Sequence, residues 1–338
     1  MDIEHFDYYL PDDLIAKKPL KNRGNSKLLI LDRISGKLID TYFYELTNLL
    51  DSSHFLVLNN TKVNKARLFC TKETGGSIEV LLLEKINDFE YSGLVKGKIN
   101  KSIKVKTGDY ILTIDKTAHS EIKHIYFNNE KASVVMEKQG SIPIPPYFKR
   151  KTNIEDEEYY QTVFAKVPGS AAAATAGLHF DNILLESLGK KGIRIIELTL
   201  NISYSTFKPI KSKILEEHQM HMEDYYIPPE AATSINEEKK KGKKLVAIGT
   251  TVVRALESAA NKSGFIEKTE HQKTDLFIKP DYTFKIVDQI ITNFHLPRSS
   301  LLVLVAAFAG LNNIMKSYAY AVEKGYRFYS YGDAMFLI

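Results

Sequence analysis

The sequence predicts an α/β protein: a large three-layer α/β sandwich domain with an inserted small all-β barrel domain. Over most of the 338 residues, apolar runs typical of buried strands alternate with helical patterns. Between residues 60 and 140, short strand-like runs instead follow one another closely, punctuated by Gly, Asn and Asp. We therefore expect residues 1–59 and 141–338 to form a discontinuous α/β domain, and residues 60–140 to form the barrel.

The first part of the chain has two apolar runs of buried-strand type, Leu28–Leu31 and Phe55–Leu58, with a short helix expected at Tyr44–Leu50. Thr74–Ser77 has the composition of a hairpin turn. The strands expected in the barrel are Ala66–Thr71, Ser77–Glu84, Phe89–Val95, Tyr110–Ile114, Glu121–Phe127 and Ala132–Met136.

The proline-rich segment Ile142–Tyr147 restrains the chain and predicts a stiff return to the α/β domain. The helices expected after it are Asp181–Gly189 with Asp181 as N-cap, Pro229–Lys241, Val252–Ala260 and Ser300–Ala309. The strands expected there are Ile193–Leu200, Leu245–Ile248, Lys285–Asn293 and a closing strand at Tyr326–Tyr331.

Composition narrows the class of protein. A single cysteine, Cys70, excludes a disulfide framework and any multi-cysteine zinc or iron–sulfur site within the chain. The chain opens without a secretory pattern, and its longest apolar stretch, Leu301–Gly310, is too short to span a bilayer. We expect a cytoplasmic protein with no membrane partner. The net charge of +5 is compatible with an RNA partner and is also common in proteins that bind none.

The strand Leu245–Ile248 runs into a glycine turn and then a helix. Backbone N–H groups at such a turn suit an anion, so Gly249, Thr250 and Thr251 are candidate binding residues. Arg254 lies about one turn further on and is expected to clamp the same anion. The alternative is that Thr251 is a plain N-cap and Arg254 pairs with Glu257. Neither a G-x-G-x-x-G turn nor a P-loop is present.

The segment Glu216–Glu223 clusters carboxylates with His218 and His221. Two histidines three residues apart share a helix face, but no third metal ligand follows at a known spacing, so we expect no metal. An acid–base or substrate-orienting role suits the cluster better, and a solvated loop is the alternative.

Three other turns present polar groups beside strands or helices. The small-residue segment at 167–180 lets a backbone approach a ligand and places Thr175, Gly177 and His179 before a helix. Asn293 and His295 follow a strand, where α/β sheets bind ligands. The alternative is that Asn293 satisfies a turn and His295 packs in the core. Asp333 follows another strand end and has a structural alternative as well.

Five lysines crowd one predicted hairpin: Lys96, Lys98, Lys101, Lys104 and Lys106. We call them the basic segment. Such a run can follow a phosphate backbone. It can also be a solvated sheet edge.

Motifs along nearly the whole chain resemble those of the S-adenosylmethionine:tRNA ribosyltransferase-isomerases of queuosine biosynthesis. They occur in the family's order. They are Phe6–Pro11, Asn59–Val63, Ala66–Leu68, Glu73–Gly76, Glu79–Leu82, Pro143–Tyr147, Tyr160–Val163, Thr175–Phe180, Glu217–His218, Met220–His221, Gly249–Thr251, Val253–Arg254, Thr274–Ile278, Thr292–Pro297 and Tyr331–Met335.

The resemblance implies an α/β domain with an inserted β-barrel. It also implies an enzyme that moves the ribosyl part of S-adenosylmethionine onto 7-aminomethyl-7-deazaguanine in a tRNA anticodon. That ribose is isomerised to give epoxyqueuosine in tRNA, and adenine and methionine leave. S-adenosylmethionine is then a consumed substrate and no cofactor is needed. We expect a monomer with no obligate protein partner.

This chemistry needs a base for the proton at the ribose 5′ carbon, a proton donor for adenine and an anion site for the methionine carboxylate. We expect His179 or His295 to be the base, and we expect both to converge with Arg254 on one cavity. The candidate catalytic residues are His179, His295, His218, His221 and Asp333. The candidate substrate-binding residues are Thr175, Gly177, Gly249, Thr250, Thr251, Arg254, Asn293, Asn59, Thr61, Arg67 and Tyr147. The basic segment is the candidate tRNA contact.

The chain departs from the family pattern at three places. Ala174 stands where the family usually has Pro, and Asn60 stands where it has Asp. Residues 201–207 lack a His and two Gly of the family pattern. The competing hypothesis is a non-catalytic tRNA-binding protein on the same fold. An ordinary methyltransferase is disfavoured because the glycine turn of that class is missing.

Overall fold

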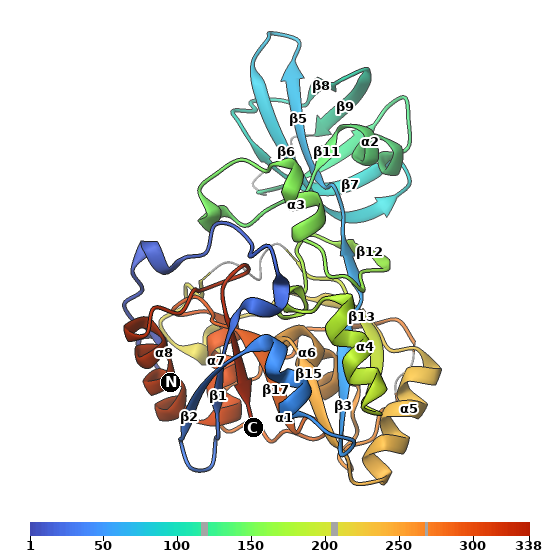
Figure 1. The fold of residues 1–338 in the computed structure, drawn as a ribbon. Coiled ribbons are helices and arrows are strands. Elements are labelled where there is room, and N and C mark those ends of the chain that lie inside the picture. Colours follow the sequence, from blue (N-terminus) through green and yellow to red (C-terminus); the bar gives the residue numbers. More distant parts are fainter. Residues whose placement is uncertain (116–120, 204–208, 268–269) are drawn as a thin grey trace.

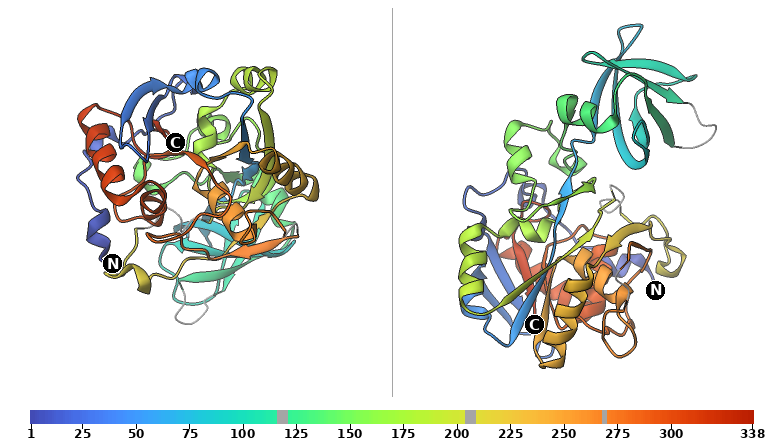
Figure 2. Two further views of the ribbon diagram at one scale, coloured as in Figure 1. Left: turned by 90° about the horizontal axis from the view of Figure 1, so that it is seen from below. Right: turned by 90° about the vertical axis from the view of Figure 1, so that its right-hand side faces the viewer.

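The chain folds into a large α/β part with a β-barrel above it (Figure 1). The computed structural model describes residues 1–338 except 116–120, 204–208 and 268–269. The second view of Figure 2 shows that the barrel stands clear of the large sheet and is reached by the chain that leads up from β3.

One nine-stranded mixed sheet forms the centre of the α/β part. Strands β13, β3, β15 and β17 run parallel to one another, so their carboxyl ends meet at one edge. The order across the sheet is β16 (Gln272–Thr274), β14 (Glu223–Tyr226), β13 (Arg194–Leu200), β3 (His54–Asn59), β15 (Lys244–Ile248), β17 (Gln289–Asn293), β18 (Ala334–Leu337), β1 (Lys27–Leu31) and β2 (Leu38–Tyr42).

Helices cover both faces of this sheet and confirm the three-layer prediction. Alternate strand residues point to opposite faces, so Leu29 and Val57 pack in one core whereas Leu28 and Leu56 pack in the other. The first core contains α5 (Pro229–Lys240), α6 (Thr250–Ala259), α7 (Ser300–Ala309) and α8 (Leu311–Glu323). The second contains α1 (Leu46–Leu49) and α4 (Asn182–Lys190).

The barrel is a six-stranded antiparallel sheet that closes because β5 pairs with both β6 and β8. Its core holds Leu68, Val80 and Ile125. The order is β5 (Arg67–Lys72), β6 (Ser77–Asn87), β7 (Glu90–Lys96), β10 (Ile122–Phe127), β9 (Tyr110–Asp115) and β8 (Ile103–Thr107). Strand β11 (Gly140–Ser141) extends β5, and α2 (Ala132–Gln139) contacts both.

A short parallel pair, β4 (Thr61–Val63) and β12 (Val167–Ser170), lies where the chain leaves and re-enters the α/β part. Helix α3 (Ile154–Tyr159) lies beside it and has a capping box from Asn153 to Asp156. The barrel strands thus extend from Arg67 to Ser141, and the division at residues 60 and 140 stays a prediction.

Local sequence explains where the helices begin. Asp181 caps α4 as predicted, because its carboxylate accepts the Leu184 N–H at 2.8 Å. Ser299 caps α7 in the same way through the Leu302 N–H. Gly249, which precedes α6, has a φ of 94°, a conformation that L side chains rarely adopt.

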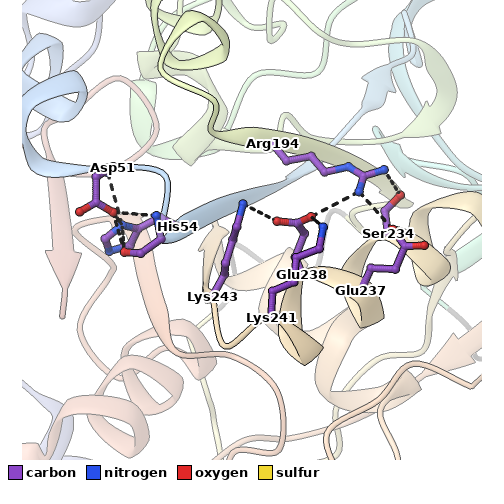
Figure 3. A network of polar contacts seen from close by, with 9 residues as sticks. Asp51, His54, Arg194, Ser234, Glu237, Glu238, Lys241 and Lys243 are labelled. Atoms are coloured by element: carbon purple, nitrogen blue, oxygen red, sulfur yellow. Dashed lines mark hydrogen bonds and ion pairs between the residues drawn. The ribbon is translucent and has the colours of Figure 1, made fainter.

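An ion cluster ties α5 to the sheet at the edge opposite the carboxyl ends (Figure 3). The buried Glu238 carboxylate contacts Lys241 at 2.8 Å, Lys243 at 2.6 Å and Arg194 at 3.4 Å. Hydrogen bonds from Lys241 and Lys243 lower the pKa of Glu238 to about 2. This cluster therefore favours the folded state wherever Glu238 is ionised.

Two predicted strands are wrong. Residues Ala132–Met136 begin helix α2, because Ala132, Val135 and Met136 repeat at helical spacing and are buried on one face. The segment at 326–331 is not a strand, since Tyr329 has a φ of 71° and turns the chain. The strand beside β1 is β18, three residues further on. The elements that were not predicted are the helices α3 and α8 and the strands β2, β4, β8, β11, β12, β14 and β16.

Within the described residues, no single helix is long and apolar enough to cross a bilayer. Helices α7 and α8 reach the length and apolar composition of a membrane span only when they are taken together. The two helices are bent by 116° at the break between them.

Candidate functional site

The carboxyl ends of β3, β13, β15 and β17 form the edge of the sheet where several candidate residues lie. This edge faces the barrel, because β3 continues from it through β4 into β5 (Figure 1). Asn59 ends β3, Gly249 follows β15 and Asn293 ends β17. Asn293 thus lies at the end of a strand, where the sequence predicted it.

The Asn59 side chain connects the ends of β3 and β13 with the start of α6. Its side-chain oxygen accepts the N–H groups of Thr61 and Leu200, and its amide donates to the Leu200 carbonyl and, at 3.3 Å, to Thr251 Oγ1. Thr61 is likewise bonded internally, to Ser170 Oγ at 2.8 Å and Asn201 Oδ1 at 3.0 Å. These contacts give both residues a structural role, and direct substrate contact stays a prediction.

The Gly249 turn is shaped as predicted, with a buried Thr250 and Thr251 at the start of α6. No side chain caps this helix. A Cβ at residue 249 would lie 3.4 Å from Ala176 Cβ, which leaves little room beside the turn. The turn thus combines helix N–H groups with two hydroxyls, a set that suits an anionic group.

Arg254 does not form the predicted clamp. Its guanidinium forms a buried ion pair with Glu223 and donates to the carbonyls of Leu276 and Thr274. The alternative pairing with Glu257 is also wrong: that carboxylate accepts backbone N–H groups at residues 285–287. Arg254 therefore fixes Glu223, whose carboxylate also accepts the Ser203 N–H at 3.0 Å.

A cavity of about 380 Å³ lies beside this ion pair. Its volume falls within the range of about 300 to 1,000 Å³ that is usual for small-molecule sites. It is lined by Pro209, Lys211, Ser212, Glu217, His218, Gln219, Met220, His221, Glu223 and Ser300. The predicted cluster His218 and His221 thus lines a polar, substrate-sized cavity.

Burial and the neighbouring His221 hold the pKa of His218 below its ordinary value. His218 is therefore neutral at pH 7, the form that can accept a proton. Its ring packs edge-on against Phe277 at a centroid distance of 5.2 Å, which restricts its orientation. The cavity brings together carboxylates, imidazoles and a lysine, the groups that general acid–base chemistry uses.

His179 is buried in a closed network instead. Its Nδ1 lies 2.8 Å from Ser26 Oγ and its Nε2 lies 3.1 Å from Asn293 Nδ2. Asn293 Nδ2 also donates to the Tyr329 carbonyl, which fixes this atom as the amide nitrogen. Nε2 therefore accepts, and Nδ1 carries the proton that it donates to Ser26. Burial, Arg327 and Arg23 lower the pKa of His179 to about 3.

His179 lines a second cavity of about 20 Å³, together with Arg23 and Arg327. This volume holds about one water molecule and no nucleoside. Both ring nitrogens of His179 are engaged and it stacks on Phe43 at 4.9 Å, so the geometry favours a positioning role.

His295 is also buried, with Nε2 3.0 Å from Thr292 Oγ1. Burial lowers the pKa of His295 to about 3. Within the described residues, no hydrogen bond joins its Nδ1. Neither cavity is lined by His295 or Arg254, and only the smaller is lined by His179. We predicted that His179, His295 and Arg254 line one cavity. This prediction is wrong for each of the two cavities described, because each side chain is held by its own internal partners.

The remaining candidates make internal contacts. Asp333 accepts the N–H groups of Lys27 and Arg327 and so anchors a turn. The Tyr147 hydroxyl bonds to Ser330 at 2.5 Å. Arg67 bonds to the Ile144 carbonyl at 3.2 Å.

Gly177 lies against Phe164 and Thr162, so a Cβ there would come within 2.6 Å of the Phe164 ring and would force these side chains to shift. Thr175 begins the short 3₁₀ turn Thr175–His179 and is half-buried. Direct ligand contacts by both residues stay predictions. In the part of the chain that the structure describes, no group of three metal-ligating side chains is gathered.

The basic segment is exposed, but it is not a hairpin. Lys96 ends β7 and Lys104 and Lys106 lie on β8, and these strands are not neighbours in the barrel. The connection between them, which carries Lys98 and Lys101, crosses from one side of the β5–β6 pair to the other. The prediction of a hairpin assumed that consecutive strands pair.

Sequence reasoning missed several residues of these sites. Glu223 belongs to the predicted cluster but was not chosen as a candidate, because its pairing with Arg254 is formed across 31 residues. Ser26, Arg23 and Arg327 surround His179, and no motif in the sequence marks them.

The fold and the cavity define a mixed α/β protein with a closed barrel and a polar, substrate-sized site near the carboxyl edge of its sheet. A family model described as queuosine biosynthesis protein matches residues 3–337. The chain belongs to this family.

Relatives named S-adenosylmethionine:tRNA ribosyltransferase-isomerase cover the whole chain and are covered wholly by it. One from Thermoanaerobacter sp. (strain X514) is 44% identical, and one from Caldanaerobacter subterraneus subsp. tengcongensis is 43% identical. The crystal structure of S-adenosylmethionine tRNA ribosyltransferase from Thermotoga maritima is 33% identical, with a TM-score of 0.57, over 99% of this chain and 100% of that chain.

The departures from the family pattern have local explanations where the structure describes them. The Asn60 amide donates to the Glu197 carboxylate at 3.1 Å, a bond that an Asp could not donate. Ala174 has a φ of −72°, which a Pro also adopts. Of residues 201–207, those from 204 onward lie outside the described residues.

Proposed function

We propose that this protein transfers the ribosyl part of S-adenosylmethionine to 7-aminomethyl-7-deazaguanine in tRNA and isomerises it, giving epoxyqueuosine in tRNA with release of adenine and methionine. Family membership over residues 3–337 and relatives of 41–44% identity that bear the enzyme name carry this proposal. S-adenosylmethionine is consumed, so the reaction needs no bound cofactor.

The 380 Å³ cavity is the proposed binding site for S-adenosylmethionine, because it has the volume of a small-molecule site and the required polar groups. Lys211 at the cavity supplies a positive charge for the methionine carboxylate. Glu217 and Glu223 supply negative charge near the sulfonium. The Gly249 turn is a second anion site at the same edge of the sheet.

We assign the acid–base steps to His218 and His221 in preference to His179. The proton at the ribose 5′ carbon is acidified by the adjacent sulfonium, and neutral His218 is in the correct form to accept it. A protonated imidazole can then donate to the departing adenine. His295 does not line this cavity, so its assignment as the base stays a prediction.

The tRNA is proposed to approach from the barrel side, because the carboxyl edge of the sheet faces the barrel and the basic segment is exposed on it. The aminomethyl group on the base must be neutral to attack. A base or a low-polarity site must therefore hold its proton off.

The test is release of adenine when the protein, S-adenosylmethionine and tRNA carrying the aminomethyl base are mixed. Adenine is expected only with all three components, and unmodified tRNA is the control. RNA binding without adenine release would favour the non-catalytic tRNA-binding protein and contradict the proposal.

A further inference from the structure

The outer face of β5 carries an exposed aromatic ring in the middle of the strand. Leu68 and Cys70 point into the barrel core, whereas Phe69 between them is 53% exposed. Arg67 and Thr71 share its face. Single exposed apolar residues are common, so the surroundings of Phe69 must decide whether it has a function.

Exposed lysines lie on both sides of this ring. On one side, Thr71 pairs with Lys106 of β8, so Lys106 is a diagonal neighbour of Phe69 and Lys104 follows on the same face. On the other side, Phe69 pairs with Glu79 of β6, which pairs with Lys96 of β7. Because strands lie about 4.8 Å apart and residues about 3.4 Å apart along a strand, Lys96 and Lys106 lie within about 10 Å of Phe69, and Lys104 lies about 14 Å away.

The charge of this face is positive. Within the described residues, no ion pair is recorded for Lys96, Lys104 or Lys106. Glu79, the acidic residue nearest the ring, is paired with Arg67 at 3.4 Å. Glu79 also lies opposite Lys96 in the strand register, so it is one carboxylate among Arg67, Lys96, Lys104 and Lys106, and the cations around the ring outnumber it.

We propose that Phe69 stacks on an unpaired base of the tRNA while Lys96, Lys104 and Lys106 hold the phosphates on either side of that base. An aromatic ring between cations is the arrangement by which proteins bind single-stranded or looped nucleic acid, since the ring takes a base and the cations take the backbone. A protein partner would bury the ring but would not need lysines on both sides. This proposal rests on the proposed function for the identity of the RNA.

The barrel offers a matched control. Phe89 lies at the β6–β7 turn and is 47% exposed, close to the exposure of Phe69. Its neighbours in sequence, Asp88 and Glu90, are acidic, and the nearby Lys85 and Lys131 are ion-paired with Asp88 at 2.7 and 3.2 Å, so the cations beside this ring are neutralised. Replacing either ring removes a similar apolar surface.

The experiment measures binding of a fluorescent anticodon stem-loop RNA by anisotropy, without S-adenosylmethionine. Phe69→Ala is expected to weaken binding about 5- to 150-fold, the usual value of one stacked base. Phe69→Tyr is expected to restore most of the affinity, and Phe89→Ala to leave it unchanged. An RNA with abasic loop positions should bind the wild type and Phe69→Ala alike.

Equal effects of Phe69→Ala and Phe89→Ala, no loss with either, or no binding of the RNA by the wild type would overturn the proposal. Thermal unfolding of each variant shows whether the barrel is intact. This experiment does not measure ribosyl transfer. The proposed RNA contact at Phe69 can therefore be refuted while the adenine-release assay supports the proposed function, and the reverse outcome is also distinguishable.

Discussion

The buried ion pair between Arg254 and Glu223 should contribute to stability far more than an exposed pair does. Both side chains are nearly inaccessible, with 5% and 2% exposed. Removing one partner leaves the other charge buried without its counter-ion, which costs about 3 to 5 kcal/mol. We therefore expect Arg254→Met to lower the free energy of unfolding by that amount, with a comparable loss for Glu223→Gln.

The double variant tests the pairing itself. Because Glu223→Gln together with Arg254→Met leaves no unpaired charge, its loss should fall short of the sum of the single losses by about 2 kcal/mol or more. The chain has no Trp, so urea unfolding is followed by far-UV circular dichroism.

Asp224 and Lys273 provide the control pair, since they join β14, the strand that carries Glu223, to β16 at the surface with 54% and 60% exposed. Their removal should cost no more than about 1 kcal/mol. Additive losses at Arg254 and Glu223 would refute the reasoning. So would an Arg254→Met variant of normal stability that binds S-adenosylmethionine weakly, because Arg254 would then serve as a ligand clamp.

Three further results are expected. His218→Gln and His221→Gln should lower single-turnover rates by about two to four powers of ten at unchanged tRNA affinity, the usual effect of a general acid or base. A normal rate in both variants would show that neither histidine acts as the general acid or base. The pKa of Glu238 is lowered to about 2 from 4.5, so its contribution to stability is full above pH 4.5 and is lost as pH falls through 2. Glu238→Gln should therefore lower the free energy of unfolding by about 1 to 2 kcal/mol at pH 7, a value that allows for solvent screening of the partly exposed lysines. The same substitution should lower it by much less near pH 2.5, which unfolding curves measured at the two pH values would show. Replacing three lysines of the basic segment by Gln should lower the log–log salt slope of tRNA binding by about 0.7 to 0.9 per lost phosphate contact; an unchanged slope would make that segment a solvated surface.

Most of the fold was predictable because its elements have strong local signals. Continuous apolar runs such as Leu245–Ile248 mark the buried strands, and Asp181 marks the start of α4. The elements that were missed or misassigned depend on tertiary context. Helix α2 contains Val134 and Val135, whose β-branched side chains suit strands, and its helical form depends on packing against β5 and β11.

The candidate site was predictable only as a set of residues. The Glu216–Glu223 cluster was found because histidines and carboxylates are concentrated there in sequence, and the structure places it at a cavity. The pairing of Arg254 with Glu223 and the network of Ser26, His179 and Asn293 join residues that are far apart in the chain. Such contacts carry no local pattern, so the sequence could not show that His179 is enclosed whereas His218 lines the larger cavity.

The central claim is that the ribosyl part of S-adenosylmethionine, and not its methyl group, enters tRNA. The most direct measurement uses S-adenosylmethionine labelled separately on ribose and on methyl, with tRNA that carries the aminomethyl base. The account predicts ribose label in the RNA and one adenine released per ribose transferred. Methyl label in the RNA, or ribose label that stays wholly in small molecules, would contradict it.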